Sequence, residues 1–227
     1  MRFYSIVALG VAAVANVALG QNLIGVDFDN GAGSPTNWNT ITSAGPFVVA
    51  DLIDESGSNT GVGFQVGGSP TFSTSALASS LPTHSQSLAG LNDYMYGTNP
   101  NSAVFSGLTP GMDYNVWVFG LRGFTMGNDV TILGGGAPIV FSQDETTTNT
   151  LWVNGSAGSN APLDSFAVVQ SADALGAISI NIADDPNAGG NGWAMAGLAI
   201  QTAVPEPGVS TLLATAGGLL ALRRRRA

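Results

Sequence analysis

The sequence contains no cysteine, no lysine and a single histidine, His84. The lack of cysteine excludes a disulfide scaffold, a thiolate metal site and a cysteine nucleophile. One imidazole excludes a metal site built from several histidines, and no Gly-x-Ser-x-Gly elbow offers a serine nucleophile. We therefore expect His84 to be an exposed loop residue and the fold to depend on a hydrophobic core.

Basic charge is scarce outside the ends of the chain. Five of the six arginines lie near the termini, which leaves Arg122 against 14 acids and a net charge of −13 for residues 21–203. A surface of this sign repels phosphate backbones and anionic lipids. The sequence thus predicts no nucleic-acid partner, and membrane contact only through the terminal segments.

The C-terminal segment has three parts. Pro205 and Pro207 flank Glu206 and keep this stretch out of a helix or a sheet interior. Residues 209–222 carry no charge, and a helix of that length spans about 21 Å, less than the roughly 30 Å core of a bilayer. Four arginines close the segment: Arg223, Arg224, Arg225 and Arg226. Such a cluster tends to stay on the cytoplasmic side of a membrane.

This order of Pro-Glu-Pro, short apolar helix and arginine cluster resembles the PEP-CTERM sorting signal of bacteria. The resemblance implies export, recognition by a membrane-embedded exosortase and cleavage near Pro205-Glu206-Pro207. It also implies display at the cell surface or release among extracellular polysaccharide, after transient inner-membrane association through the apolar helix. A nucleic-acid tail and an uncleaved membrane anchor are the alternatives that the residues leave open.

The N-terminal segment predicts a secretory signal peptide. Arg2 precedes an apolar stretch over residues 6–19, and Ala18 and Gly20 are the small residues that a signal peptidase reads. Cleavage is expected before Gln21, with a buried N-terminal helix as the alternative. The predicted organisation is a signal peptide (1–20), one β-sandwich domain (21–203) and a sorting signal (204–227).

Between these segments the apolar residues form short runs separated by Gly, Asn, Asp, Ser and Pro, a pattern typical of strands. It predicts an all-β, antiparallel β-sandwich of the jelly-roll or galactose-binding-like kind, flanked by the two terminal helices. Residues 71–87 are Ser/Thr-rich and are expected to form a long loop, or a short helix around 75–80. The expected strands are 23–28, 47–53, 62–66, 103–105, 114–119, 130–133, 139–141, 150–153, 166–169, 178–182 and 195–200.

The stretch from Leu108 to Tyr114 indicates the sandwich more specifically. Its Leu-x-Pro-Gly-x-x-Tyr pattern resembles the tyrosine corner of β-sandwich domains, in which the phenol hydrogen-bonds to the backbone just upstream. The strand that follows carries bulky side chains on both faces, and we expect it to be central.

Two kinds of residue are candidates for binding. Acidic loops beside glycine offer the oxygen ligands that Ca²⁺ favours, although Asp and Asn are also common turn formers. The candidate calcium ligands are Asp27, Asp29, Asp184 and Asp185. Trp38 and Trp193 lie next to asparagine or glycine in predicted loops, and their flat rings could face a sugar.

The sequence as a whole predicts an exported, non-enzymatic structural or binding protein of the bacterial envelope or its polysaccharide matrix. Its expected partners are the export machinery, signal peptidase, exosortase and extracellular polysaccharide. The alternative is a secreted carbohydrate-active hydrolase, which would need two carboxylates facing each other across a cleft.

Overall fold

A computed structural model describes residues 22–29, 33–42, 46–68, 70–74, 81–85, 87–120, 127–144, 151–188 and 192–203. These residues belong to one compact unit, Gln21–Ala203. The predicted signal helix and the predicted C-terminal apolar helix lie outside the described residues. In the described part of the chain, no helix is long and apolar enough to span a membrane.

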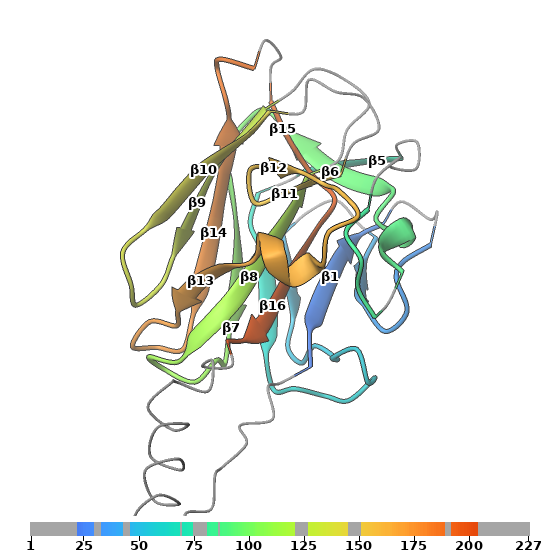
Figure 1. Cartoon of the computed structure of the whole chain (residues 1–227). Helices are drawn as coiled ribbons and strands as arrows, with labels where there is room; N and C mark the ends of the chain where they lie inside the picture. Colours follow the sequence, from blue (N-terminus) through green and yellow to red (C-terminus); the bar gives the residue numbers. More distant parts are fainter. Residues whose placement is uncertain are drawn as a thin grey trace, which may run out of the picture. The chain divides into compact units, whose positions relative to one another are not determined.

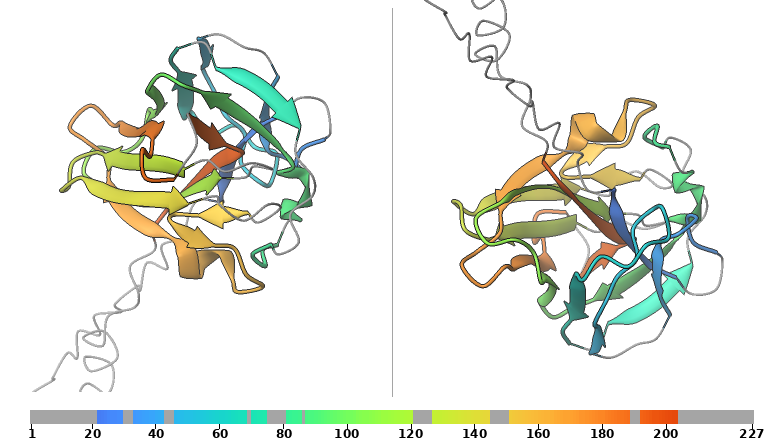
Figure 2. Two further views of the ribbon diagram at one scale, coloured as in Figure 1. Left: turned by 90° about the horizontal axis from the view of Figure 1, so that it is seen from above. Right: turned by 90° about the horizontal axis from the view of Figure 1, so that it is seen from below.

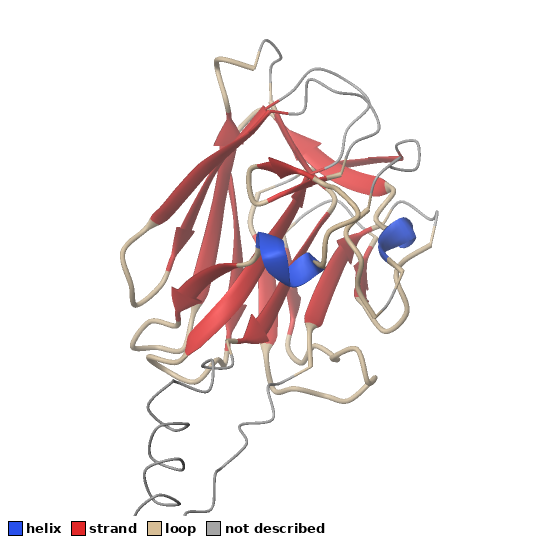
Figure 3. Ribbon diagram, in the orientation of Figure 1, coloured by secondary structure: helices blue, strands red, loops and turns tan. Residues whose placement is uncertain are grey.

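The unit consists of strands in three sheets, with two short 3-10 helices, η1 (Leu88–Gly90) and η2 (Leu163–Phe166), as Figures 1 and 3 show. The seven-stranded sheet runs in the order β12 (Ser156–Ala157), β11 (Trp152–Val153), β8 (Asp113–Gly120), β16 (Gly197–Thr202), β1 (Ile24–Phe28) and β2 (Asn39–Ile41), with β13 (Val168–Ser171) also paired to β8. The six-stranded sheet runs in the order β10 (Ile139–Asp144), β9 (Gly127–Leu133), β14 (Ile178–Asp184), β7 (Asn101–Ser106), β4 (Gly63–Val66) and β3 (Phe47–Val49). The small sheet consists of β15 (Trp193–Met195), β6 (Asp93–Gly97) and β5 (Thr71–Thr74).

The main core lies between the two large sheets. On β14, Ile178, Ile180 and Ile182 are buried while the residues between them are partly exposed, as the alternation of the sequence predicts. These isoleucines share one hydrophobic cluster with Val116 and Val118 of β8 in the other sheet. The prediction of an all-β sandwich is therefore confirmed.

Strand β8 is central, as predicted, because it is buried on both faces. Trp117 and Phe119 point away from the main core and belong to a second hydrophobic cluster, together with Leu88 of η1 and Leu163 of η2. The indole N–H of Trp117 donates to the carbonyl oxygen of Leu163 at 3.0 Å. This bond satisfies the one polar group of a fully buried tryptophan and fixes η2 over the outer face of the sheet.

The structure differs from the prediction in its pairing and in several strand assignments, and it divides the predicted strand 195–200 between β15 and β16. The pairing is not wholly antiparallel, because β1 and β2 run parallel. Residues 71–74, expected in a loop, form strand β5 and pair with β6, where no strand was predicted. The helix expected around 75–80 lies outside the described residues.

The tyrosine corner is present. The phenol oxygen of Tyr114 accepts a hydrogen bond from the backbone N–H of Thr109 at 3.0 Å. Tyr114 itself is buried against the main core, and Leu108 is buried beside it. The bond therefore ties the crossover between the two sheets to the start of the central strand β8.

We expect Tyr114→Phe to lower the free energy of unfolding by about 1 kcal/mol or more, because the Thr109 N–H loses its acceptor while the ring stays buried. The shift of the midpoint in urea unfolding, at constant slope, measures this cost. An unchanged midpoint would show that the phenol hydroxyl does not stabilise the corner.

Both ends of the described chain lie at the same end of the sandwich. Ile24, at the start of β1, pairs with Ile200, near the end of β16. In the same register, β16 begins with Gly197 at the opposite end of the sandwich. There the small sheet of β5, β6 and β15 closes the sandwich (Figure 1; Figure 2, left). We call this far end the distal end.

Candidate functional site

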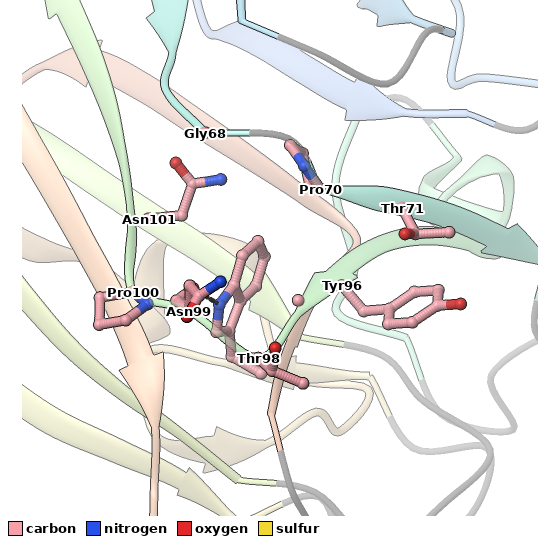
Figure 4. Close-up of a pocket in the computed structure, with 10 residues that line it drawn as sticks. Gly68, Pro70, Thr71, Tyr96, Thr98, Asn99, Pro100 and Asn101 are labelled. Carbon is pink, nitrogen blue, oxygen red and sulfur yellow. Dashed lines mark hydrogen bonds between the residues drawn. The ribbon is translucent and has the colours of Figure 1, made fainter.

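A pocket of about 410 Å³ lies at the distal end, within the range of about 300–1,000 Å³ that small-molecule sites occupy. It forms where the turn after β6 meets the start of β5 and the start of β15, and we call it the distal pocket (Figure 4). Its lining residues are Gly68, Pro70, Thr71, Tyr96, Gly97, Thr98, Asn99, Pro100, Asn101 and Trp193.

Trp193 is built rigidly into this pocket. Its side chain is only 1% exposed, and its indole N–H donates to the carbonyl oxygen of Asn99 at 2.6 Å. A Cβ atom at Gly97 would lie 2.9 Å from the six-membered ring, so glycine allows the indole to pack directly against β6. The sequence prediction placed Trp193 in a loop as an exposed ring. The structure instead makes it part of a strand and of the pocket wall.

A second pocket of about 410 Å³ adjoins the first and shares Gly68, Pro100 and Asn101 with it. Its other lining residues are Gly67, Ser102 and Asn181. Ser102 and Asn181 are directly paired on the outer face of the six-stranded sheet, so we call this the sheet-face pocket. Asn101 stands between the two pockets, held by the Ser102 N–H, which donates to its Oδ1 at 2.7 Å.

The lining of both pockets is polar but uncharged. Amides, hydroxyls, prolines, glycines and two aromatic rings make up the two sets of residues, and neither set contains Asp, Glu, His or Arg. In a domain of net charge −13 this is a neutral surface within an acidic one. Such a lining can exchange hydrogen bonds with hydroxyl groups and contact apolar ring faces.

The prediction that Trp38 faces a sugar is wrong. Trp38 is 4% exposed, and its ring packs against Phe119 with a centroid distance of 5.7 Å. It also covers Gly25 of β1, and it belongs to the second hydrophobic cluster. No free face of the indole is left for a ligand, because the loop that carries it is folded onto the outer face of the seven-stranded sheet.

The candidate calcium ligands lie beside loops whose residues 30–32 and 189–191 are outside the described residues. Among the described residues, no three acidic or imidazole side chains converge in a way that could hold a metal ion. Asp185 instead caps its own turn, since its Oδ1 accepts from the backbone N–H of Asn187 at 2.8 Å and from its side-chain amide at 3.0 Å. This is the ordinary turn-forming role of Asp, and Asp184 beside it ends strand β14.

Asp27 is in a different environment. It is fully buried in β1, neither carboxyl oxygen accepts a hydrogen bond, and the nearby Ser34 hydroxyl pairs with Thr40 at 2.7 Å. Burial raises the pKa of Asp27 to about 7, the Ser34 hydroxyl lowers it, and the carboxylates of Asp29 and Asp93 raise it further. Asp27 is therefore partly protonated at neutral pH.

The histidine is not the exposed loop residue that we expected. His84 Nε2 lies 2.5 Å from Glu55 Oε1, and the His84 side chain is only 16% exposed. Ser85 Oγ lies 3.3 Å from the same nitrogen. A Ser-His-acid triad needs the serine and the acid on opposite ring nitrogens. Here both contact Nε2, so the arrangement is not a catalytic relay and serves to join the 81–85 segment to the loop before β4.

No protein-family model matches the sequence, and a search of curated proteins found no match. Three of the solved structures that match this chain show partial similarity to it. An exo-β-1,3-galactanase from Phanerochaete chrysosporium is 13% identical with a TM-score of 0.35, and the match covers 60% of this chain and 27% of that one. A family 35 carbohydrate binding module from Clostridium thermocellum is 11% identical with a TM-score of 0.27, covering 58% and 90%.

The ANXUR2 extracellular domain from Arabidopsis thaliana is 9% identical with a TM-score of 0.33, covering 78% of this chain and 58% of that one. This chain thus spans less than a third of the galactanase. At these identities and TM-scores, the likenesses do not extend to function.

Proposed function

We propose that this protein is an exported, non-enzymatic binding protein with a jelly-roll-like body, and that its distal pocket binds an uncharged carbohydrate. The observation that carries the proposal is the uncharged lining of the pocket, in which amides and hydroxyls lie beside Tyr96, a partly exposed aromatic residue. Carbohydrates present hydroxyl groups along their edges and apolar C–H faces, and this lining matches both.

The arrangement favours binding over the hydrolase alternative. Glycoside hydrolysis commonly uses two carboxyl groups about 5 to 10 Å apart on either side of the scissile bond. The residues that line the two pockets include no carboxylate, and the contacts of Ser85, His84 and Glu55 do not form a triad. The described pockets thus offer groups that hold a sugar but none that would donate or accept its protons.

A glycan array that contains neutral and uronic-acid oligosaccharides tests the proposal with the full-length protein. We expect binding to neutral glycans only. Asn99→Ala and Thr98→Ala should each lower the affinity about five-fold, the equivalent of one lost hydrogen bond of about 1 kcal/mol. Both side chains are exposed in the pocket wall, and the Asn99 carbonyl that holds Trp193 is kept.

Asn160→Ala is the matched control, because Asn160 is also exposed but lies outside both pockets. It should leave the affinity unchanged. Binding that is lost equally in all three variants, or that is restricted to acidic glycans, would rule out the distal pocket as the site.

We further propose that the C-terminal segment delivers the protein to the cell surface as an exosortase substrate. The proposal rests on the order of Pro205-Glu206-Pro207, the apolar residues 209–222 and the four terminal arginines. Deleting residues 204–227 should leave the body folded but abolish surface display, measured by fractionation of the producing cells. Unchanged display of the truncated protein would refute the sorting role.

A further inference from the structure

The two adjoining pockets have a consequence for the length of the ligand. Gly68, Pro100 and Asn101 line both pockets, so the two pockets meet at these residues. The second pocket lies beyond Asn101 on the outer face of the six-stranded sheet. A ligand long enough to fill both pockets would therefore pass Asn101 and reach Ser102 and Asn181.

The sheet face beyond this point carries a row of polar side chains. Register places Ser102 of β7 opposite Asn181 of β14, and Asn181 opposite Thr131 of β9. All three alternate with buried neighbours and are partly exposed, so they project from the same face. Neighbouring strands are about 4.8 Å apart, so the row repeats a hydroxyl or an amide at that interval across the sheet.

We infer that the site binds an internal segment of an uncharged polysaccharide chain, which runs from the distal pocket across Asn101 and along the Ser102–Asn181–Thr131 row. This rests on the proposed carbohydrate binding and specifies its ligand class. A site for single sugars or chain ends would close around one unit. Here two pockets of similar volume share three lining residues, and a regular row of polar side chains follows the second pocket.

The inference is tested by measuring how tightly oligosaccharides of increasing length bind to the full-length protein. The probes are β-1,3- and β-1,4-linked oligomers of glucose and of galactose, from the monosaccharide to the hexasaccharide, measured by titration calorimetry. In the series that binds, affinity should rise with length beyond the disaccharide. Asn181→Ala should lower the affinity for the hexasaccharide about five-fold and leave the affinity for the monosaccharide unchanged.

Ser179→Ala is the matched control. Ser179 lies two residues earlier on the same strand and face but does not line the sheet-face pocket, so both affinities should stay unchanged. Equal affinity for the monosaccharide and the hexasaccharide, or an Asn181→Ala protein that binds the hexasaccharide normally, would overturn the extended site while leaving the distal pocket intact. Failure of every oligomer to bind would overturn both proposals.

Discussion

Replacing the buried carboxyl group with an amide, in Asp27→Asn, should make the protein more stable than wild type at pH 8, with little of this gain at pH 4. Asp27 is fully buried, and neither of its carboxyl oxygens accepts a hydrogen bond. Its charged form is therefore poorly stabilised in the fold. Asparagine has nearly the same shape and stays neutral at every pH, so the variant avoids this cost.

The sign and size of the effect follow from the two pKa values of Asp27, which are 3.8 for an unperturbed side chain and about 7 in the folded protein. Below pH 3.8 the carboxyl group is protonated in both the folded and the unfolded state, so its ionisation costs nothing. Between pH 3.8 and 7 the folded state keeps a proton that the unfolded chain has lost, so stability falls by about 1.4 kcal/mol per pH unit. Above pH 7 the loss levels off at about 4 kcal/mol.

Urea unfolding of wild type and Asp27→Asn at pH 4, 6 and 8 measures this effect. The buried amide has its own unsatisfied groups, which cost about 1–3 kcal/mol at all three pH values. The informative quantity is therefore the change in the difference between the two proteins with pH. Asp164→Asn, at an exposed position on η2, is the control and should run parallel to wild type. A pH-independent difference for Asp27→Asn would show that Asp27 does not titrate in this range.

The strands that could be predicted from sequence are those whose side chains alternate strongly. In β14 and β8 the apolar pattern is visible within a few residues of sequence. Burial of one face in β14 and of both faces in β8 determines which positions are apolar. β5 and β6 were missed for the opposite reason. Thr71–Thr74 is mostly Ser and Thr, and it becomes a strand only by pairing with Asp93–Gly97, which in turn pairs with β15 nearly 100 residues later.

The candidate site could also be predicted only in part, because its contacts join residues that are distant in sequence. Trp193 was singled out by its neighbours in sequence, but its contact with Gly97 and Asn99 depends on the register between β15 and β6. His84 and Glu55 are 29 positions apart, and no local sequence pattern predicts that they pair. The burial of Trp38 could not be predicted from sequence either, because it depends on Gly25 in strand β1.

The second large effect on stability is expected from substitutions at Gly25 and Trp38. Gly25 is the second residue of β1, and a Cβ atom there would come within 2.2 Å of Trp38 Cδ2 and 2.3 Å of Cε2. The ring cannot move away easily, since Trp38 is buried and packs against Phe119. Gly25→Ala should therefore cost at least the 1–3 kcal/mol typical of overpacking, and Trp38→Ala about 3–5 kcal/mol through the cavity it leaves.

The double variant Gly25→Ala/Trp38→Ala should be no less stable than Trp38→Ala alone, because the added methyl group then enters the space that the indole occupied. The coupling energy from the four urea unfolding curves should be about 1–3 kcal/mol in the direction of rescue. If Gly25→Ala alone fails to fold, recovery of folding in the double variant is the same result. Gly67→Ala is the control, because its Cβ would make only an ordinary contact with Asn101 at 3.5 Å. Additive costs at Gly25 and Trp38 would mean that the packing of the indole does not depend on the absence of a side chain at Gly25.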